Sequence, residues 1–284
     1  MNMTTLSLGI STCPNDTFIF GALAQGRVCL EGIDLGITLA DVEELNRWAG
    51  TGGPDIVKVS VAAVAGILDE YWLLRAGGAM GYGVGPLLLG NTGMELNDLA
   101  GARVAIPGRH TTANLLLGLL LREQGIEVEL VEMVFDQIME AVKSGSVRAG
   151  LVIHEGRFTY EKQSLVKLVD LGQWWEQSRK LPIPLGAIAI RRSLGLDVAA
   201  KVNRGIYESL FIARGDESAV WPYVKHHAQE MCANVVLEHI RTFVTAYSLD
   251  VGEDGENAVA GIVAESCRAM GRALPSDPIF APIG

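Results

Sequence analysis

The chain has 284 residues, of which 49% are hydrophobic, and its formal net charge is −10. This length and composition allow a sizeable core in one large or two modest domains. The acidic balance disfavours nucleic acid as a partner, because a polyanion requires a broad basic surface. A small anion is still compatible with the sequence, since backbone N–H groups and hydroxyls can bind it locally.

No apolar run approaches the roughly 18 residues of a membrane-spanning helix, so no membrane contact is expected. The first residues, Met1–Leu8, lack the basic and apolar segments of an export signal, which favours a cytoplasmic location. The four cysteines are widely spaced, and HExxH, paired CxxC, P-loop and GxGxxG signatures are missing. We therefore expect no metal site.

Short apolar strands alternate with helical stretches along the whole chain, which is typical of an α/β fold. Three units of strand, loop and helix are predicted. In the first, the strand Leu6–Ile10 precedes a helix that ends at about Ala24; in the second, Asp55–Val59 precedes Val61–Leu68; in the third, Ala102–Ile106 precedes Ala113–Arg122. Hydroxyl residues stand at each junction between a strand's carboxyl end and the next helix. Open α/β sheets bind ligands at such junctions.

Two extended segments, Tyr82–Leu89 and Pro184–Ile190, indicate that the chain passes from one lobe to a second and back. We predict a larger α/β lobe from 1–89 plus 188–284 and a smaller inserted lobe at 90–187. By analogy this is the two-lobed, periplasmic-binding-protein-like fold of type II, with a ligand cleft between the lobes. The last third is predicted to be mainly helical scaffold, and the tail Pro275–Gly284 to lack regular structure.

His154 directly follows an apolar strand in the segment Gly150–Arg157, at the strand end where catalytic groups of α/β proteins gather. An imidazole suits proton abstraction because it titrates near neutral pH. The alternative is a histidine that only forms local hydrogen bonds. Position alone leaves both open.

Thr111, Thr112 and the N–H of Ala113 open a helix and form a plausible anion site. Helix capping alone would also explain the two hydroxyls. His110, in the same loop, could contact a ligand, but we favour a supporting role for it.

Asn15 lies in the loop Ser11–Asp16, where ligand contact and helix capping are both open. Lys58 and Ser60 flank Val59 at a strand end, so alternation puts both polar side chains on one face. A buried lysine is costly without a partner, which supports a ligand or an acidic neighbour. His226, His227 and His239 show no metal-ligand spacing and are interpreted as surface or core residues.

Four long segments resemble the 1,4-dihydroxy-6-naphthoate synthase family. The segments are Ser11–Phe20, Pro107–Ala113, Ile153–Tyr160 and Tyr247–Gly252. They occur in the family's order and the resemblance spans essentially the whole chain. Strings of this length are far more specific than a lone short motif.

The resemblance implies a carbon–carbon lyase of the futalosine route to menaquinone, which converts cyclic dehypoxanthinyl futalosine to 1,4-dihydroxy-6-naphthoate. It implies that His154 is the proton acceptor, and that neither cofactor nor metal takes part. Residues at the family's ligand-binding strings are Lys58, Val59, Ser60, Thr112 and Ala113. The expected partner is a small aromatic carboxylate substrate, and a homodimer is left open.

Two alternatives are kept. One is an enzyme of the chorismate-dehydratase type with the same fold, which acts on another carboxylate; the strand-end His154 argues against it. The other is a cytoplasmic protein that only binds a small carboxylate, since the fold alone does not determine function.

Overall fold

The computed structural model describes residues 3–228, 232–274 and 276–282. The chain divides into two compact units: unit 1 runs to Gly81 and resumes at Pro184, and unit 2 comprises Tyr82–Ile183. Both boundaries between the units lie a few residues earlier in the sequence than the predicted boundaries at 89/90 and 187/188. The reason is strand pairing: β6 (Leu87–Asn91) lies in the sheet of unit 2, whereas β11 (Ile183–Arg191) pairs with strands of unit 1.

Unit 1 is built on a mixed sheet in the order β2-β1-β3-β11-β4, with β5 paired to β11. Its further strands are β1 (Thr4–Ser11), β2 (Ile33–Ala40), β3 (Ile56–Ser60), β4 (Tyr71–Leu73) and β5 (Ala79–Gly81). β1 pairs in parallel with β2 and β3, whereas β11 runs antiparallel to β3 and β4. The carboxyl ends of β1 and β3 therefore meet at one edge of this sheet.

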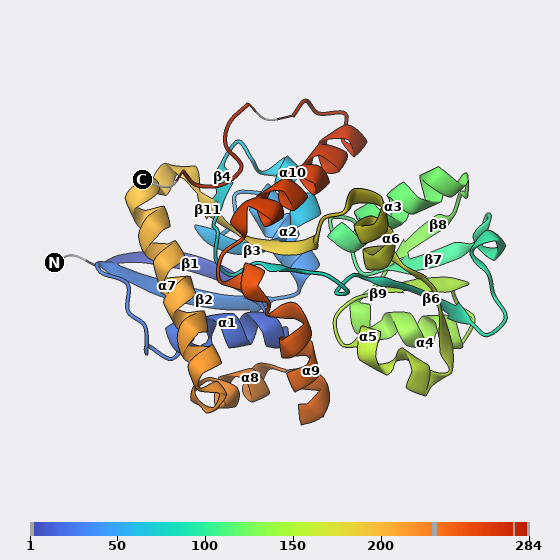
Figure 1. The fold of residues 1–284 in the computed structure, drawn as a ribbon, viewed down its shortest axis with the longest axis horizontal. Helices are drawn as coiled ribbons and strands as arrows, with labels where there is room; N and C mark the ends of the chain where they lie inside the picture. Colours follow the sequence, from blue (N-terminus) through green and yellow to red (C-terminus); the bar gives the residue numbers. More distant parts are fainter. Residues whose placement is uncertain (1–2, 229–231, 275, 283–284) are drawn as a thin grey trace. The chain divides into compact units, whose positions relative to one another are not determined.

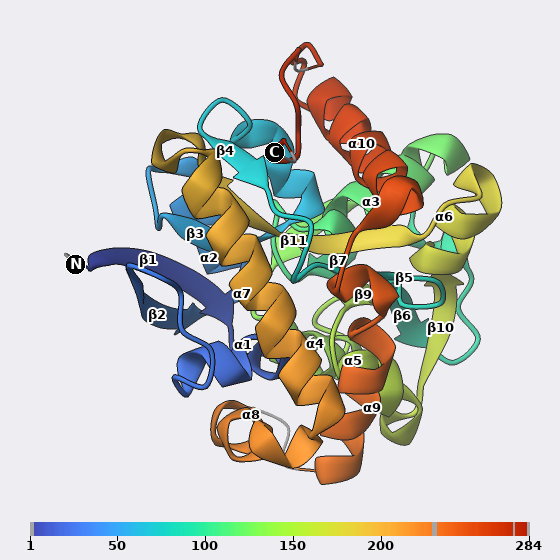
Figure 2. The ribbon, with the colours of Figure 1, turned by 60° about the vertical axis from the view of Figure 1, so that its left-hand side comes forward.

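The described residues of unit 1 also form helices. They are α1 (Pro14–Ala24), α2 (Val42–Gly50), α7 (Leu196–Gly215), α8 (Trp221–His227), α9 (Ala233–Phe243) and α10 (Gly252–Ala269), with short 3₁₀ helices at Val61–Gly66, Arg192–Leu194, Glu217–Ala219 and Ala246–Ser248. α7 lies beside α1 in both views, and α8 and α9 also contact α1 (Figures 1 and 2). α1 is buried over most of its length, as expected for a helix that is apolar nearly all round.

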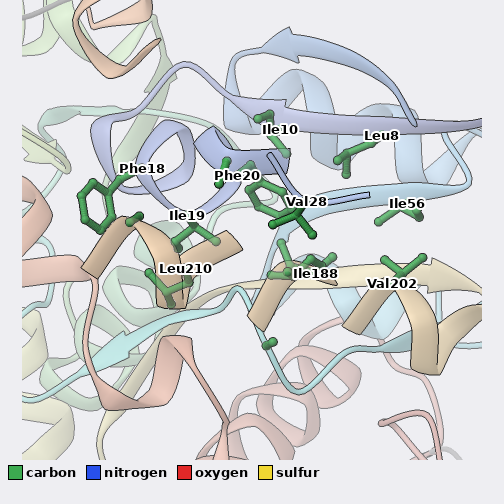
Figure 3. Close-up of a cluster of buried hydrophobic side chains, with 14 of the residues drawn as sticks. Leu8, Ile10, Phe18, Ile19, Phe20, Val28, Ile56, Ile188, Val202 and Leu210 are labelled. Atoms are coloured by element: carbon green, nitrogen blue, oxygen red, sulfur yellow. The ribbon is translucent and has the colours of Figure 1, made fainter. Parts of the chain in front are cut away.

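The core of unit 1 lies between the sheet and these helices. Figure 3 shows Leu8, Phe20, Ile56, Ile188 and Leu210, which come from three strands and two helices and are all buried. All residues of β3 are buried too, as expected for a central strand that is covered on both faces. This packing holds the carboxyl ends of β1 and β3 in place within unit 1.

Unit 2 contains a second mixed sheet in the order β10-β6-β9-β7-β8 (Figure 1). Its further strands are β7 (Arg103–Ile106), β8 (Glu129–Glu132), β9 (Ala149–Val152) and β10 (Leu165–Asp170). Its helices are α3 (Thr112–Gln124), α4 (Ile138–Lys143), α5 (Gly156–Thr159) and α6 (Leu171–Arg179), with 3₁₀ helices at Leu96–Leu99, Phe135–Gln137 and Tyr160–Gln163. β7 pairs in parallel with β8 and β9, and β6 runs antiparallel to β9 and β10.

The three predicted strand, loop and helix units are present, with one local difference. The segment after β3 is a 3₁₀ helix that ends at Gly66. The described residues of the tail contain no helix or strand, as predicted, and Phe280 forms one isolated parallel bridge with Leu73. Hydrogen bonds of Leu73 with Ile279 and Ala281 flank that bridge and attach the tail to β4. Pro275, Ile283 and Gly284 lie outside the described residues.

No helix within the described ranges is long and apolar enough to cross a membrane. This finding agrees with the absence of long apolar runs in the sequence.

Gly172→Ala should destabilise unit 2. A Cβ at Gly172 would lie 2.6 Å from the Cα of Gly85, so the backbone would have to move. We expect the free energy of unfolding to fall by about 1–3 kcal/mol, as for other overpacked sites, in urea denaturation. Gly118→Ala is the matched control: this exposed α3 residue has nothing within 4 Å of its Cβ position, and alanine should stabilise the helix by roughly 0.5–1 kcal/mol. Unchanged stability of Gly172→Ala would contradict the close approach.

Candidate functional site

Two groups of predicted site residues in unit 2 lie at the same edge of its sheet. β7 and β9 are neighbouring parallel strands, with Val104 opposite Ala149 and Ala105 opposite Gly150. Thr111–Ala113 follow the carboxyl end of β7, and His154 follows the carboxyl end of β9. Parallel pairing thus brings the predicted anion site and the predicted base to one edge.

His154 has an unusual backbone conformation, with φ at +55°. A non-glycine residue in the left-handed region is uncommon, and such strain is concentrated at functional sites. The His154 ring packs against Phe135 at 4.9 Å between ring centroids, and its side chain is partly buried. The turn therefore presents an imidazole at the sheet edge beside an apolar wall.

Arg157 anchors the segment that carries His154. Its guanidinium donates to the carboxylate of Asp170 at 2.9 Å and also to the carbonyl of Gly85. Asp170 in turn accepts from the N–H of Gln173 and caps α6. The N–H of Arg157 donates to the carbonyl of His154 at 3.3 Å. The strand-end turn is thereby connected to two other segments of unit 2.

Tyr160 is the last residue of the segment Ile153–Tyr160, which contains His154. Burial, followed by the hydrogen bond to Glu161, raises the pKa of Tyr160. The phenol, which is protonated at neutral pH even at its ordinary pKa, donates to Glu161 at 3.1 Å.

Thr111 is the N-cap of α3, and its hydroxyl is engaged in the cap. Thr111 Oγ1 accepts from the N–H of Asn114 at 3.1 Å and donates to the carbonyl of Gly108 at 2.8 Å. Thr112 and Ala113 are buried in the first helical turn, where backbone N–H groups have no intrahelical acceptor. Capping accounts for Thr111, and the positive end of the helix at this first turn suits an anion. His110 is exposed in the preceding loop.

Lys58 lies at the corresponding edge in unit 1, near the carboxyl end of β3. It is only 4% exposed, and its ammonium contacts the Asp16 carboxylate at 2.6 Å and the Gly77 carbonyl at 3.2 Å. The acidic neighbour expected for a buried lysine is therefore Asp16, in the first turn of α1. An ammonium has three hydrogens, so these contacts leave one for a ligand.

Asn15 links the Asp16 member of this ion pair to His239. Its amide nitrogen donates to Asp16 Oδ1 at 2.8 Å, and its amide oxygen contacts His239 Nε2 at 2.9 Å. Asn15 is 6% exposed and His239 is fully buried. These bonds give Asn15 an internal bridging role, and its contact with substrate stays a prediction.

Ser60 and Val59 occupy opposite faces of β3. Ser60 forms two hydrogen bonds with the side chain of Asn46: its N–H donates at 2.8 Å, and its hydroxyl accepts at 3.0 Å. Val59 is fully buried and can offer a ligand only its backbone. Lys58 and Ser60 thus share a face, as the alternation of the strand predicts.

The sequence analysis did not single out Asn46 and interpreted His239 only as a surface or core residue. For the loop that ends at Asp16 it left ligand contact and helix capping open. Asn46 lies on the amphipathic helix α2, where a polar residue carries no signal. His239 is a single histidine on α9, 224 residues from its partner Asn15. His226, in contrast, is exposed on α8 as expected. Within the described part of the chain, no cluster of His, Cys, Asp and Glu could hold a metal ion.

Comparison with known proteins adds a family to this geometry. Two relatives, each bearing the name 1,4-dihydroxy-6-naphthoate synthase, match almost the whole chain. The protein from Thermus thermophilus is 48% identical and covers 98% of this chain and 100% of its own. The protein from Streptomyces coelicolor is 45% identical and covers 99% and 100%. These matches confirm the resemblance that the four segments indicated.

Solved structures confirm the periplasmic-binding-protein-like fold. Protein AF1704 from Archaeoglobus fulgidus superposes with a TM-score of 0.86 at 33% identity, covering 94% of this chain and 98% of its own. The ligand-binding component of an ABC-type import system from Staphylococcus aureus gives a TM-score of 0.71 at 14% identity, covering 99% and 97%. The latter likeness concerns the fold alone. A ligand cleft between the lobes stays a prediction.

The model of a family described as menaquinone biosynthesis matches residues 6–265. This range includes every residue assigned to the two sheet edges above. The chain therefore belongs to the menaquinone biosynthesis family.

Proposed function

We propose that this chain is a carbon–carbon lyase that converts cyclic dehypoxanthinyl futalosine to 1,4-dihydroxy-6-naphthoate, with His154 as the proton acceptor. The observation that carries the proposal is the placement of His154 on a strained turn after β9, in a chain 48% identical to a synthase of that name. The reaction is a biosynthetic step, and a cytoplasmic location goes with this proposal.

His154 would act by removing an acidic C–H proton from the substrate. An imidazole is a suitable base at neutral pH, because part of it is unprotonated and its conjugate acid can return the proton. Loss of the proton starts the cleavage of a carbon–carbon bond, the sugar-derived fragment is released, and formation of an aromatic ring drives the reaction. The apolar ring of Phe135 beside the imidazole restricts the space in which His154 can turn.

In unit 1, Lys58 and Ser60 would bind the substrate carboxylate. The Lys58 ammonium is held at 2.6 Å from Asp16, and one of its hydrogens is left for a carboxylate oxygen. In unit 2, the first turn of α3, which contains Thr112 and Ala113, would by itself suit an anionic group of the substrate. Local donors of this kind suit a chain of formal charge −10.

The defining experiment incubates the purified protein with cyclic dehypoxanthinyl futalosine, without added metal or cofactor, and detects 1,4-dihydroxy-6-naphthoate by chromatography and mass spectrometry. Product formation supports the lyase. If the folded protein binds the substrate but forms no product, the binding-protein alternative gains. Conversion of chorismate instead would favour the dehydratase alternative.

His154→Ala should reduce kcat by at least about 100-fold, because general base catalysis contributes roughly 10²–10⁴-fold. The affinity for substrate should stay close to that of the wild type, since the other donors are intact. Steady-state kinetics and calorimetric binding measure the two quantities. His226→Ala is the control, an exposed histidine on α8 that should leave both unchanged. Turnover at the wild-type rate in His154→Ala would remove this residue from the mechanism.

Lys58→Met should lower kcat/KM by roughly 10–100-fold, the value of a hydrogen bond to a charged group. It should also lower the melting temperature, because it leaves the Asp16 carboxylate buried without its cation. Adding Asp16→Asn removes that second penalty. The double variant should therefore regain stability but not kcat/KM. Recovery of kcat/KM in the double variant would show that Lys58 acts only in folding.

A further inference from the structure

Four buried side chains of unit 1 form a continuous polar chain, which we call the Lys58 chain: Lys58, Asp16, Asn15 and His239. Its links are Lys58 Nζ to Asp16 Oδ1 at 2.6 Å, Asn15 Nδ2 to Asp16 Oδ1 at 2.8 Å, and His239 Nε2 to Asn15 Oδ1 at 2.9 Å. The Lys58 chain thus connects strand β3, helix α1 and helix α9. Only its Lys58 end belongs to the proposed substrate site.

The hydrogen bonds that link the Lys58 chain each have a defined direction. Asp16 accepts through Oδ1 from Lys58 and Asn15, and through Oδ2 from the hydroxyl of Ser11 at 2.7 Å. The amide nitrogen of Asn15 is turned to Asp16, so its oxygen faces His239. We therefore assign the hydrogen of this contact to His239 Nε2.

Burial of the Lys58 chain costs free energy, because its polar groups lose their contact with water. His239 is 0% exposed, Asp16 1% and Lys58 4%. Well-packed hydrophobic side chains of similar volume stabilise a core as well as or better than a buried ion pair. Stability alone therefore does not explain four polar residues at this place.

The neighbouring strand β11 also leaves space for the Lys58 side chain, because it has a glycine at position 186. A Cβ at Gly186 would lie 2.7 Å from Lys58 Cε, so glycine leaves the volume that the lysine stem occupies. A lysine side chain has high rotamer entropy, and it points in one direction only when its surroundings enforce it. Asp16, Gly77 and Gly186 together determine where the ammonium lies.

We propose that His239 and Asn15 are positioning residues, which orient the Asp16 carboxylate and through it fix the Lys58 ammonium for the substrate carboxylate. This inference rests on the proposed function of Lys58. In this role His239 and Asn15 act through Asp16 and Lys58, and need no contact of their own with the substrate. Without the His239 hydrogen bond, the Asn15 amide can turn and no longer holds Asp16 Oδ1 in its present direction.

The kinetic test compares His239→Phe with His239→Gln. Phenylalanine keeps a ring beside Phe243, which now packs at 4.6 Å from His239, but removes the donor. We expect KM to rise about tenfold, the effect of one lost buried hydrogen bond, with kcat within about twofold of the wild type. Glutamine supplies an amide N–H near the position of Nε2 and should restore most of the KM.

Asn15→Leu is a second variant of similar size, in case His239→Phe does not fold. It should raise KM as His239→Phe does. Val236→Ala is the matched control, a buried residue on the same helix α9 that is not part of the Lys58 chain. It should lower the melting temperature but leave KM unchanged. An equal rise of KM in Val236→Ala would show that α9 acts only through general stability and would overturn the proposal.

A final test needs no substrate and separates this inference from the proposed function. Reductive methylation of the folded protein, followed by mass spectrometry of peptides, measures how fast Lys58 reacts. Lys58 should react slowly in the wild type and in Val236→Ala, but several-fold faster in His239→Phe and Asn15→Leu. Equal rates in all four proteins would overturn the positioning role. If Lys58 reacts as expected but the wild type forms no naphthoate, only the proposed function fails.

Discussion

Parallel pairing of neighbouring strands is the constraint on which the rest of the structure depends. In unit 1 the parallel strands β1 and β3 end at one sheet edge, and in unit 2 β7 and β9 do the same. Loops that are far apart in the sequence are brought together because parallel strands share the direction of their carboxyl ends. Lys58 meets Asp16 in this way, and His154 comes to the same edge as the first turn of α3.

The two edges solve different chemical problems. The edge of unit 1 buries a cation against a carboxylate and surrounds both with amide and hydroxyl partners, which keeps the ammonium in a fixed place. The edge of unit 2 offers helix N–H groups and an imidazole on a strained turn, which Arg157 connects to Asp170. Fixed donors stabilise charge more effectively than mobile ones, because they need not reorganise during the reaction.

The same fold serves unrelated functions, so the fold alone does not indicate catalysis. The import component from Staphylococcus aureus shares the architecture at 14% identity, whereas the synthase from Thermus thermophilus shares 48% of its residues with this chain. What distinguishes a binding protein from an enzyme on such a scaffold is the chemistry of single side chains. In the proposed function that side chain is His154, because binding alone would not require a base.

The sequence by itself determined the strands and their carboxyl ends, because apolar runs such as Leu6–Ile10 and Ala102–Ile106 are local patterns, and it placed His154 after one of them. Family resemblance came from equally local strings. Only the tertiary structure decided which polar residues meet: Asn46 bonds Ser60, and His239 reaches Asn15 across 224 residues. No periodicity encodes such contacts. They depend on how the helices pack on the sheet, and that packing is settled by the whole core rather than by any one segment.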